Sequence, residues 1–203
     1  MKAFLLLGGL LLTITVSSPA QSRVSIAPSY WFNYNPYSYQ ANLTYNGSNT
    51  QFRASGYNII SSFGLTTRYH FTPQWNLSVG VLYNRNTDYI QSPQSPYGEP
   101  TPFTSEGWQV PVLVSYRLTS RRLSTYFSTG ALLTKSKTFT EAPIRTDGVV
   151  GVGLAYQFDS GLSLLLQPTA SYPFTKPASD AFYQVTNYSS YSIGLQTQLI
   201  WHF

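Results

Sequence analysis

Few side chains in this chain of 203 residues have the chemistry of a catalytic or metal site. There are two histidines and no cysteine, which excludes disulfides, thiolate metal sites and a lipid-anchored lipoprotein. A serine nucleophile needs a base within hydrogen-bond reach, and His70 and His202 are both expected to point inward. Lipid hydrolases built on barrels instead carry these groups on the outer surface. We therefore expect no catalysis, no metal and no cofactor.

Four basic residues gather if the chain forms strands. Arg68 and His70 are two residues apart on one segment and therefore share a face. Arg117 and His202 lie at the ends of two other segments. Side chains alternate between the two faces of a strand, which places all four on the polar face. One interpretation is an anion-binding constriction. The other, which we favour, is hydrogen-bonded filling of a barrel interior, with Asp159 or the terminal carboxylate as partner.

Eight segments that alternate with period two must position these residues. Each sets an apolar face against a face of Ser, Thr, Gly, Asn and Gln, and no helical period of useful length is present after the first 20 residues. The segments are 24–34, 59–71, 75–84, 108–118, 123–134, 150–158, 162–174 and 191–203. Because a closed barrel has no free edge, prolines inside these segments predict bulges or strand limits; they are Pro28, Pro111 and Pro168.

The distribution of charge decides which face points outward. Only 9% of the residues are charged, where soluble domains carry about 25%. The middles of the apolar faces carry no charge, which a lipid-facing surface requires, and all seven acidic residues fall in predicted loops or turns. An open sheet edge cannot lie in hydrocarbon. The sequence therefore predicts an all-β fold, an eight-stranded antiparallel up-and-down transmembrane β-barrel.

Loops and aromatics orient this barrel. Long and short connections alternate, and tyrosines and tryptophans cluster at both ends of the segments, as in the two aromatic belts of outer-membrane barrels. An even number of strands places both termini on the periplasmic side and the long loops outside. Asn46-Gly47 is a hairpin signal, so the first two strands can continue beyond the membrane. Some apolar residues point inward, and they either pack in the lumen or reveal an unrecognised bulge: Ile60, Leu82, Leu113, Leu132, Leu165 and Ile200.

The first 20 residues have the pattern of a cleaved signal peptide. Lys2 precedes an apolar stretch, and Ser18-Pro19-Ala20 places small residues at the cleavage positions. Residues 21–203 then form the barrel domain. The formal net charge of +5, without a long basic run, gives no reason to expect nucleic acid as a partner.

The last segment resembles the C-terminal signal that the outer-membrane insertion machinery reads in bacterial barrels. The residues that carry this resemblance are Tyr191, Leu195, Leu199, Trp201 and Phe203. Residues 109–116 and 126–130 also resemble the fourth and fifth strands of the PorT-like family of outer-membrane β-barrels. This resemblance implies a location in the bacterial outer membrane, with lipid and the insertion machinery as partners, and a fold, but no reaction.

We expect a structural or surface-interaction role for a monomeric barrel, with no identified surface ligand. A narrow pore for small solutes and a soluble lipocalin-like barrel that binds a ligand are the alternatives. Aromatic residues in the predicted surface loops offer contact area for a protein or glycan; they are Tyr37, Tyr39, Tyr45, Tyr89, Tyr97 and Phe103.

Overall fold

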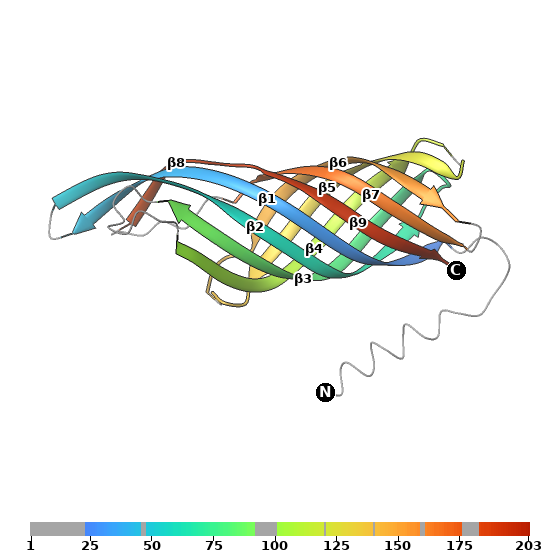
Figure 1. Ribbon diagram of the computed structural model, residues 1–203, viewed down its shortest axis with the longest axis horizontal. Helices are drawn as coiled ribbons and strands as arrows, with labels where there is room; N and C mark the ends of the chain where they lie inside the picture. Colours follow the sequence, from blue (N-terminus) through green and yellow to red (C-terminus); the bar gives the residue numbers. More distant parts are fainter. Residues whose placement is uncertain are drawn as a thin grey trace, which may run out of the picture.

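A computed structural model describes residues 23–45, 48–91, 101–119, 121–139, 141–158, 161–175 and 183–203. These residues form one antiparallel sheet (Figure 1). Its strands are β1 (Val24–Tyr45), β2 (Ser48–His70), β3 (Trp75–Gln91), β4 (Thr101–Arg117), β5 (Leu123–Ser136), β6 (Arg145–Gln157), β7 (Leu162–Pro173), β8 (Tyr183–Ser190) and β9 (Ser192–His202). Within the described ranges, no helix is long and apolar enough to cross a membrane.

The sheet closes on itself. β1 pairs with β2 on one side and with β9 on the other, so that the order β2-β3-β4-β5-β6-β7-β9-β1 forms a ring of eight strands. β8 and β9 both pair with β1, β8 with residues 37–43 and β9 with residues 25–34. They form one course along β1 that is interrupted at Tyr191. The predicted eight-stranded antiparallel barrel is confirmed, and its eighth segment is longer than the sequence analysis expected.

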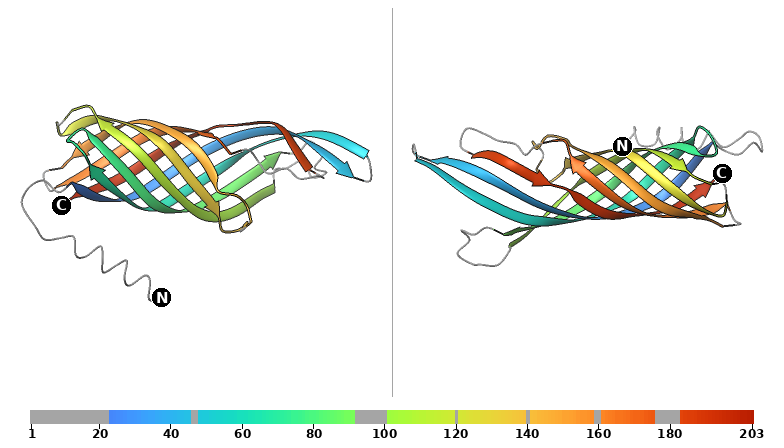
Figure 2. Two further views of the ribbon diagram at one scale, coloured as in Figure 1. Left: turned by 180° about the vertical axis from the view of Figure 1, so that it is seen from behind. Right: turned by 90° about the horizontal axis from the view of Figure 1, so that it is seen from above.

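β1 and β2 run far beyond the rest of the barrel. They pair without a register shift from Val24 opposite Tyr69 to Tyr45 opposite Ser48. The expectation that the first two strands can continue beyond the membrane is therefore confirmed, because their pairing continues up to the Asn46-Gly47 pair, which itself lies outside the described residues. Figures 1 and 2 show this hairpin, with β8 beside it, extending past the ring.

Longer strands also correct the placement of the acidic residues. Asp88, Glu106 and Asp147 lie within β3, β4 and β6 and not in loops. Each lies near the end of its strand that is remote from the C-terminus of the chain. The strands continue past the lipid-facing band, where water can solvate a carboxylate or where the lumen offers it a partner.

The two faces of the strands have the predicted orientation. Large apolar side chains point outward and are exposed on every strand of the ring, among them Phe63, Leu65, Val81, Val150 and Trp201. Small polar side chains point inward. Of the doubtful inward residues, Leu82, Leu113, Leu132, Leu165 and Ile200 are buried in the lumen. They belong there and do not indicate unrecognised bulges.

None of the three strand prolines produces a bulge or ends its strand, contrary to the prediction. Pro28, Pro111 and Pro168 keep their partners in one neighbouring strand, Leu65, Leu132 and Leu195. On the other side, the ladders β1–β9, β3–β4 and β6–β7 lack the pairs at the proline but resume in the same register. A proline lacks one N–H group, so it interrupts the ladder on one side only.

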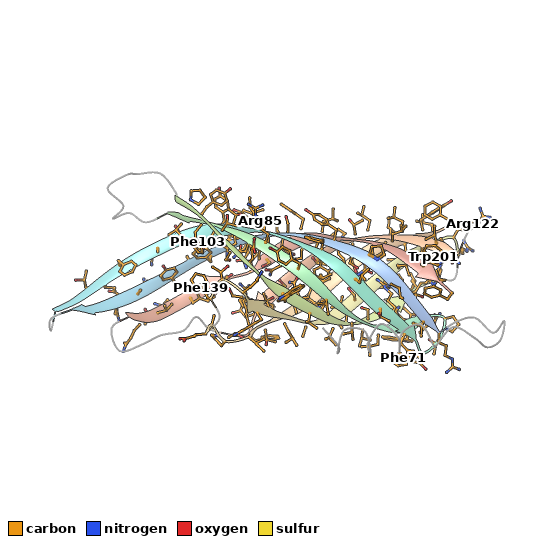
Figure 3. All side chains as sticks on the ribbon, turned by 90° about the horizontal axis from the view of Figure 1, so that it is seen from below. Phe71, Arg85, Phe103, Arg122, Phe139 and Trp201 are labelled. Carbon is orange, nitrogen blue, oxygen red and sulfur yellow. The ribbon has the colours of Figure 1, made fainter. Side chains whose placement is uncertain are left out.

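Aromatic residues mark two ends of the outer surface. At the end where the C-terminus lies, called the terminal end here, the ring centroids of Trp75 and Tyr116 are 4.8 Å apart and those of Tyr156 and Phe158 are 4.9 Å apart. At the opposite end, the loop end, Tyr83 lies between Phe63 and Trp108. Figure 3 shows Phe71, Arg122 and Trp201 at the terminal end and Arg85, Phe103 and Phe139 toward the loop end.

The separation of these ends fits a membrane. Tyr191 and Trp201 stand on the outer face ten residues apart. At ~3.3 Å per residue and a strand tilt of ~40°, this spacing spans ~25 Å along the barrel axis. The apolar band of an outer-membrane barrel has about the same height.

Candidate functional site

The lumen contains a cavity at the terminal end, called the end cavity here. Its volume is about 740 Å³, within the range of about 300–1,000 Å³ typical of small-molecule sites. Three of the four basic residues predicted to cluster, His70, Arg117 and His202, line it together with Arg23. No aspartate or glutamate is among its described lining residues. Of the two expected partners, Asp159 lies outside the described residues, and Phe203, which carries the terminal carboxylate, lines the cavity.

Arg68, the fourth predicted residue, lies deeper in the lumen. Its side chain is 2% exposed. Its guanidinium donates to the Tyr126 hydroxyl at 3.1 Å and to the side-chain amide oxygen of Gln198. It also lies 5.3 Å from the centroid of the Tyr126 ring. Asn76 lies 2.5 Å from the same hydroxyl. Tyr126 also lines the end cavity, and it therefore separates Arg68 from that space.

Serines hold the two histidines. The Ser25 hydroxyl lies 3.0 Å from His70 Nε2 and 3.0 Å from His202 Nδ1, and the Ser163 hydroxyl lies 3.0 Å from His202 Nε2. The imidazole centroids are 5.8 Å apart. β1, β2 and β9 bring these residues together, because Ser25 is opposite His202 of β9 and His70 of β2 follows Tyr69, which forms the last β1–β2 pair with Val24. The histidine orientations are thus fixed by neutral hydroxyls.

A layer of apolar side chains lies between the two ends of the lumen. Trp31, Leu82, Leu113, Leu132 and Val149 form one buried cluster, called the apolar layer here. Trp31 is 1% exposed and Leu82 is fully buried. These residues come from five of the six consecutive strands β1 to β6, all except β2, and their side chains meet across the interior.

The lumen beyond the apolar layer is narrow and polar. A cavity of about 60 Å³ is lined there by residues such as Asn33, Asn84 and Gln109. Arg145 and Asp147 form an ion pair at 2.8 Å beside it. This carboxylate therefore neutralises a cation at the loop end, whereas the described basic residues of the end cavity have no such aspartate or glutamate among them.

The second candidate site is the extension of β1, β2 and β8 past the ring, called the projecting sheet here. In it, β1 residues 37–43 pair with β2 on one side and with β8 on the other. Asn187 has a φ of 50° next to the register shift between β1 and β8 at Ser38 and Gln40. The Asn187 side chain donates to Gln40 at 2.7 Å, which fastens β8 to the hairpin.

A tyrosine and an aspartate join the projecting sheet to β3. The Tyr37 hydroxyl donates to the Asp88 carboxylate at 2.7 Å. Burial, followed by the hydrogen bond to Asp88, raises the pKa of Tyr37 far above its usual value. Burial also raises the pKa of Asp88, while the hydrogen bond from Tyr37 opposes this effect. Asp88 lies five residues beyond Tyr83 of the aromatic belt, outside the lipid-facing band.

Five of the six predicted surface aromatics are strand residues and not loop residues. Tyr37 and Tyr39 belong to β1, with ring centroids 6.2 Å apart, and Tyr89 of β3 stacks on Tyr57 at 4.8 Å. Phe103 of β4 lies 5.7 Å from Phe139. Tyr45 ends β1, but its side chain lies outside the described part, as does Tyr97. The sequence placed these residues in loops because it underestimated the length of the strands.

The residues of the predicted insertion signal share one face. All five lie on the outer surface at the C-terminal strand and are exposed: Tyr191, Leu195, Leu199, Trp201 and Phe203. Their role in insertion remains a prediction.

Sequence reasoning missed several residues that the structure assigns to the lumen. Trp31 lies at an inward position of β1, and its parity alone could have identified it. Ser25, Ser163 and Gln198 were recognised only as polar lumen residues, because their partners come from other strands. The pairing of Tyr37 with Asp88 depends on the projecting sheet, which a single segment of sequence does not specify.

A closed ring, a lipid-facing outer surface and two aromatic belts define the class of transmembrane β-barrels. The family described as outer membrane protein beta-barrel domain matches residues 8–197, so the chain belongs to this family of bacterial outer-membrane proteins. No curated protein sequence matches the chain.

Solved barrels are similar to the structure at low sequence identity. OprG from Pseudomonas aeruginosa is 11% identical, with 90% of this chain and 97% of OprG covered and a TM-score of 0.57. AlkL, solved in lipid bilayers, is 12% identical, with 93% and 94% covered and a TM-score of 0.46. The outer-membrane protease OmpT from Escherichia coli is 8% identical, with 92% and 99% covered and a TM-score of 0.40. The likeness to OprG shows a shared fold.

Proposed function

We propose that this outer-membrane barrel is a non-catalytic surface-interaction protein that presents the projecting sheet to partners outside the cell. One observation carries the proposal: the longest strands of the chain, of 22 and 23 residues, build a sheet beyond the lipid-facing band. A barrel that only had to span the membrane would need strands of about 9–11 residues.

The edges of the projecting sheet indicate the kind of partner. β2 pairs with β3 only as far as Ser55, opposite Gln91. From Ser48 to Ala54, the only described strand that pairs with β2 is β1, and β8 likewise pairs only with β1, although Phe52 and Val185 each make an interaction of their own. Unpaired backbone groups at a sheet edge are templates for another strand. An extended peptide segment of a partner protein fits this surface by strand addition.

The apolar layer opposes the alternative of a narrow pore. A path for ions or small polar solutes would have to pass Trp31 and Leu82, which have exposures of 1% and 0%. Moving polar solutes through a dry apolar constriction is unfavourable because they lose hydration without gaining hydrogen bonds. The soluble alternative fails, because the chain belongs to an outer-membrane family.

The hydrogen bonds between serines and histidines do not make a persuasive catalytic site. Ser25 is fully buried and lies between two imidazoles, so a substrate cannot approach its hydroxyl. Ser163 borders the end cavity, but its partner His202 is already oriented by Ser25 through its other ring nitrogen. No carboxylate orients either base among the described residues. This arrangement supports the non-enzymatic assignment.

Several finer assignments belong to the same proposal. The segments 109–116 and 126–130 support placement near the PorT-like barrels. The alternation of long and short connections supports an orientation with the projecting sheet outside and both termini in the periplasm. The proposal also includes cleavage after Ala20, insertion by the barrel-insertion machinery through the outward residues of β9, and a monomer in lipid.

A shortened hairpin tests the proposal. Residues 40–53 are replaced by Asn-Gly, which joins Tyr39 to Ala54, two residues that already pair; a two-residue turn suits such a pair. Both barrels, in nanodiscs, are used to select phage-displayed peptides of about 12 residues, which are long enough to form a strand. Peptides that bind the full barrel, fail on the shortened one and lose binding when a central proline is introduced are expected. Equal enrichment on both barrels would overturn the proposal.

A further inference from the structure

The end cavity combines positive charge with the lack of an aspartate or glutamate among its described lining residues. Arg23, Arg117, His70 and His202 line it, and Arg68 lies behind Tyr126. Whatever the protonation state of the two histidines, the three arginines place three guanidinium groups around this space. Of these three groups Arg68 is buried, and because a buried charge is ordinarily paired with an opposite charge, its position requires an explanation.

Arg68 makes the case most clearly. Its side chain is only 2% exposed. The partners of its terminal nitrogens are the Tyr126 hydroxyl and the Gln198 side-chain amide, and neither is a carboxylate. Within the part of the chain that the structure describes, its Nε has no partner, and the same holds for the neighbouring amide nitrogen of Gln198. Two buried donors beside an uncompensated cation create a region that attracts negative charge.

The cavity also has donors at its surface. The Tyr126 hydroxyl receives a hydrogen bond from Arg68. It forms a second hydrogen bond with the side-chain amide of Asn76. Either orientation of the Asn76 amide leaves one more donor, a tyrosine O–H or an amide N–H, near the cavity wall. One terminal nitrogen of Arg117 donates to the backbone carbonyl of Arg121 at 2.8 Å and to the side-chain amide oxygen of Gln157 at 3.3 Å, while its Nε has no partner among the described residues.

We infer that the end cavity binds an oxyanion of the phosphate type, carried on a small solute or on a lipid headgroup. Arg117 and Arg23 contact the oxyanion, and planar guanidinium groups suit phosphate geometry. Arg68 acts as a positioning residue, which holds Tyr126 and adds positive potential from behind it. The apolar wall, including Phe71 and Ile200, accommodates the rest of the ligand. This inference does not depend on the projecting sheet.

Arginine-selective nuclear magnetic resonance provides the test. The full mature chain, refolded in maltoside micelles that contain no phosphate, carries ¹⁵N-labelled arginine. Inorganic phosphate is titrated in one arm, and short-chain phosphatidylglycerol is titrated in the other, against phosphatidylcholine of the same chain length. Saturable shifts of the Arg68 and Arg117 Nε–H signals are expected in at least one arm. Saturation with phosphate assigns a solute, and saturation with phosphatidylglycerol alone assigns a lipid headgroup.

Two substitutions and a control complete the experiment. Arg117→Gln is expected to weaken binding at least about tenfold, since it removes a charged hydrogen-bond donor. Arg23→Gln serves as a second variant, because Arg23 precedes β1 and only its backbone carbonyl receives a hydrogen bond from His70. Arg85→Gln removes the same charge from the exposed loop end and should leave binding unchanged. Linear, unsaturated shifts in both arms, or equal weakening by Arg85→Gln, would overturn the inference.

Discussion

Replacing Trp31 with alanine perturbs the apolar layer at its largest member. Trp31 is 1% exposed and packs in one cluster with Leu82, Leu113, Leu132 and Val149. Burial of ~200 Å² by an aromatic side chain, at ~25 cal/mol per Å², is worth about 5 kcal/mol, and core Trp→Ala substitutions cost about 3–5 kcal/mol. No described residue accepts a hydrogen bond from the Trp31 indole N–H, so its removal relieves an unsatisfied donor worth about 1–3 kcal/mol. The expected net loss is about 3 kcal/mol.

Urea unfolding of barrels in lipid vesicles, followed by gel mobility without boiling, measures this loss. Trp108→Ala is the matched control, because it deletes the same side chain from the outer face, where Trp108 is 49% exposed. Lipid fills the space left there, so no internal cavity adds to the cost. A loss below about 1 kcal/mol for Trp31→Ala, or one no larger than that of the control, would refute the packing of Trp31 in a closed layer.

Three further predictions concern other parts of the molecule. Tyr37→Phe removes the hydrogen bond that lowers the pKa of Asp88, so carboxyl ¹³C titration should show that pKa rising further; a fall would contradict the contact. Because burial already raises this pKa, the stabilising contribution of the aspartate is complete below its unfolded value near ~3.9 and is lost as the pH rises through the folded value. Gly130→Ala places a methyl group against the β4 backbone and should lower the free energy of unfolding by about 1–3 kcal/mol; an unchanged urea midpoint would show that the strands separate easily. In variants with a single tryptophan, brominated lipid should quench Trp201 but not Trp31, and equal quenching would mean that the faces are assigned wrongly.

Local sequence patterns were sufficient for the ring but not for its extensions. Alternation of side chains identified all eight positions in the ring and their outward faces, because lipid on one side and a filled lumen on the other impose opposite requirements. It underestimated β1 and β2, because the apolar face of β1 changes from the even positions of residues 24–34 to the odd positions Tyr37, Tyr39, Ala41 and Leu43. That change of phase resembles the end of a strand, and only Asn46-Gly47 indicated that the hairpin continues to a turn.

The candidate sites were predictable in part. Parity placed Arg68, His70, Arg117 and His202 on the inner face, but the donors and acceptors around them come from strands far apart in the chain. Prolines misled the prediction because the rule that confines them to edges or bulges ignores the second neighbour of each strand. A strand that loses its ladder on one side retains the other, as Pro28 does opposite Leu65.

Conductance of the wild-type barrel in a planar bilayer tests the central claim most directly, that the lumen is closed and the surface carries the function. Insertion is verified beforehand by the shifted gel mobility of unboiled protein. The closed apolar layer predicts a baseline without discrete steps, in salts of small monovalent ions. Regular single-channel steps from inserted, folded protein would contradict the closed lumen and favour the narrow pore.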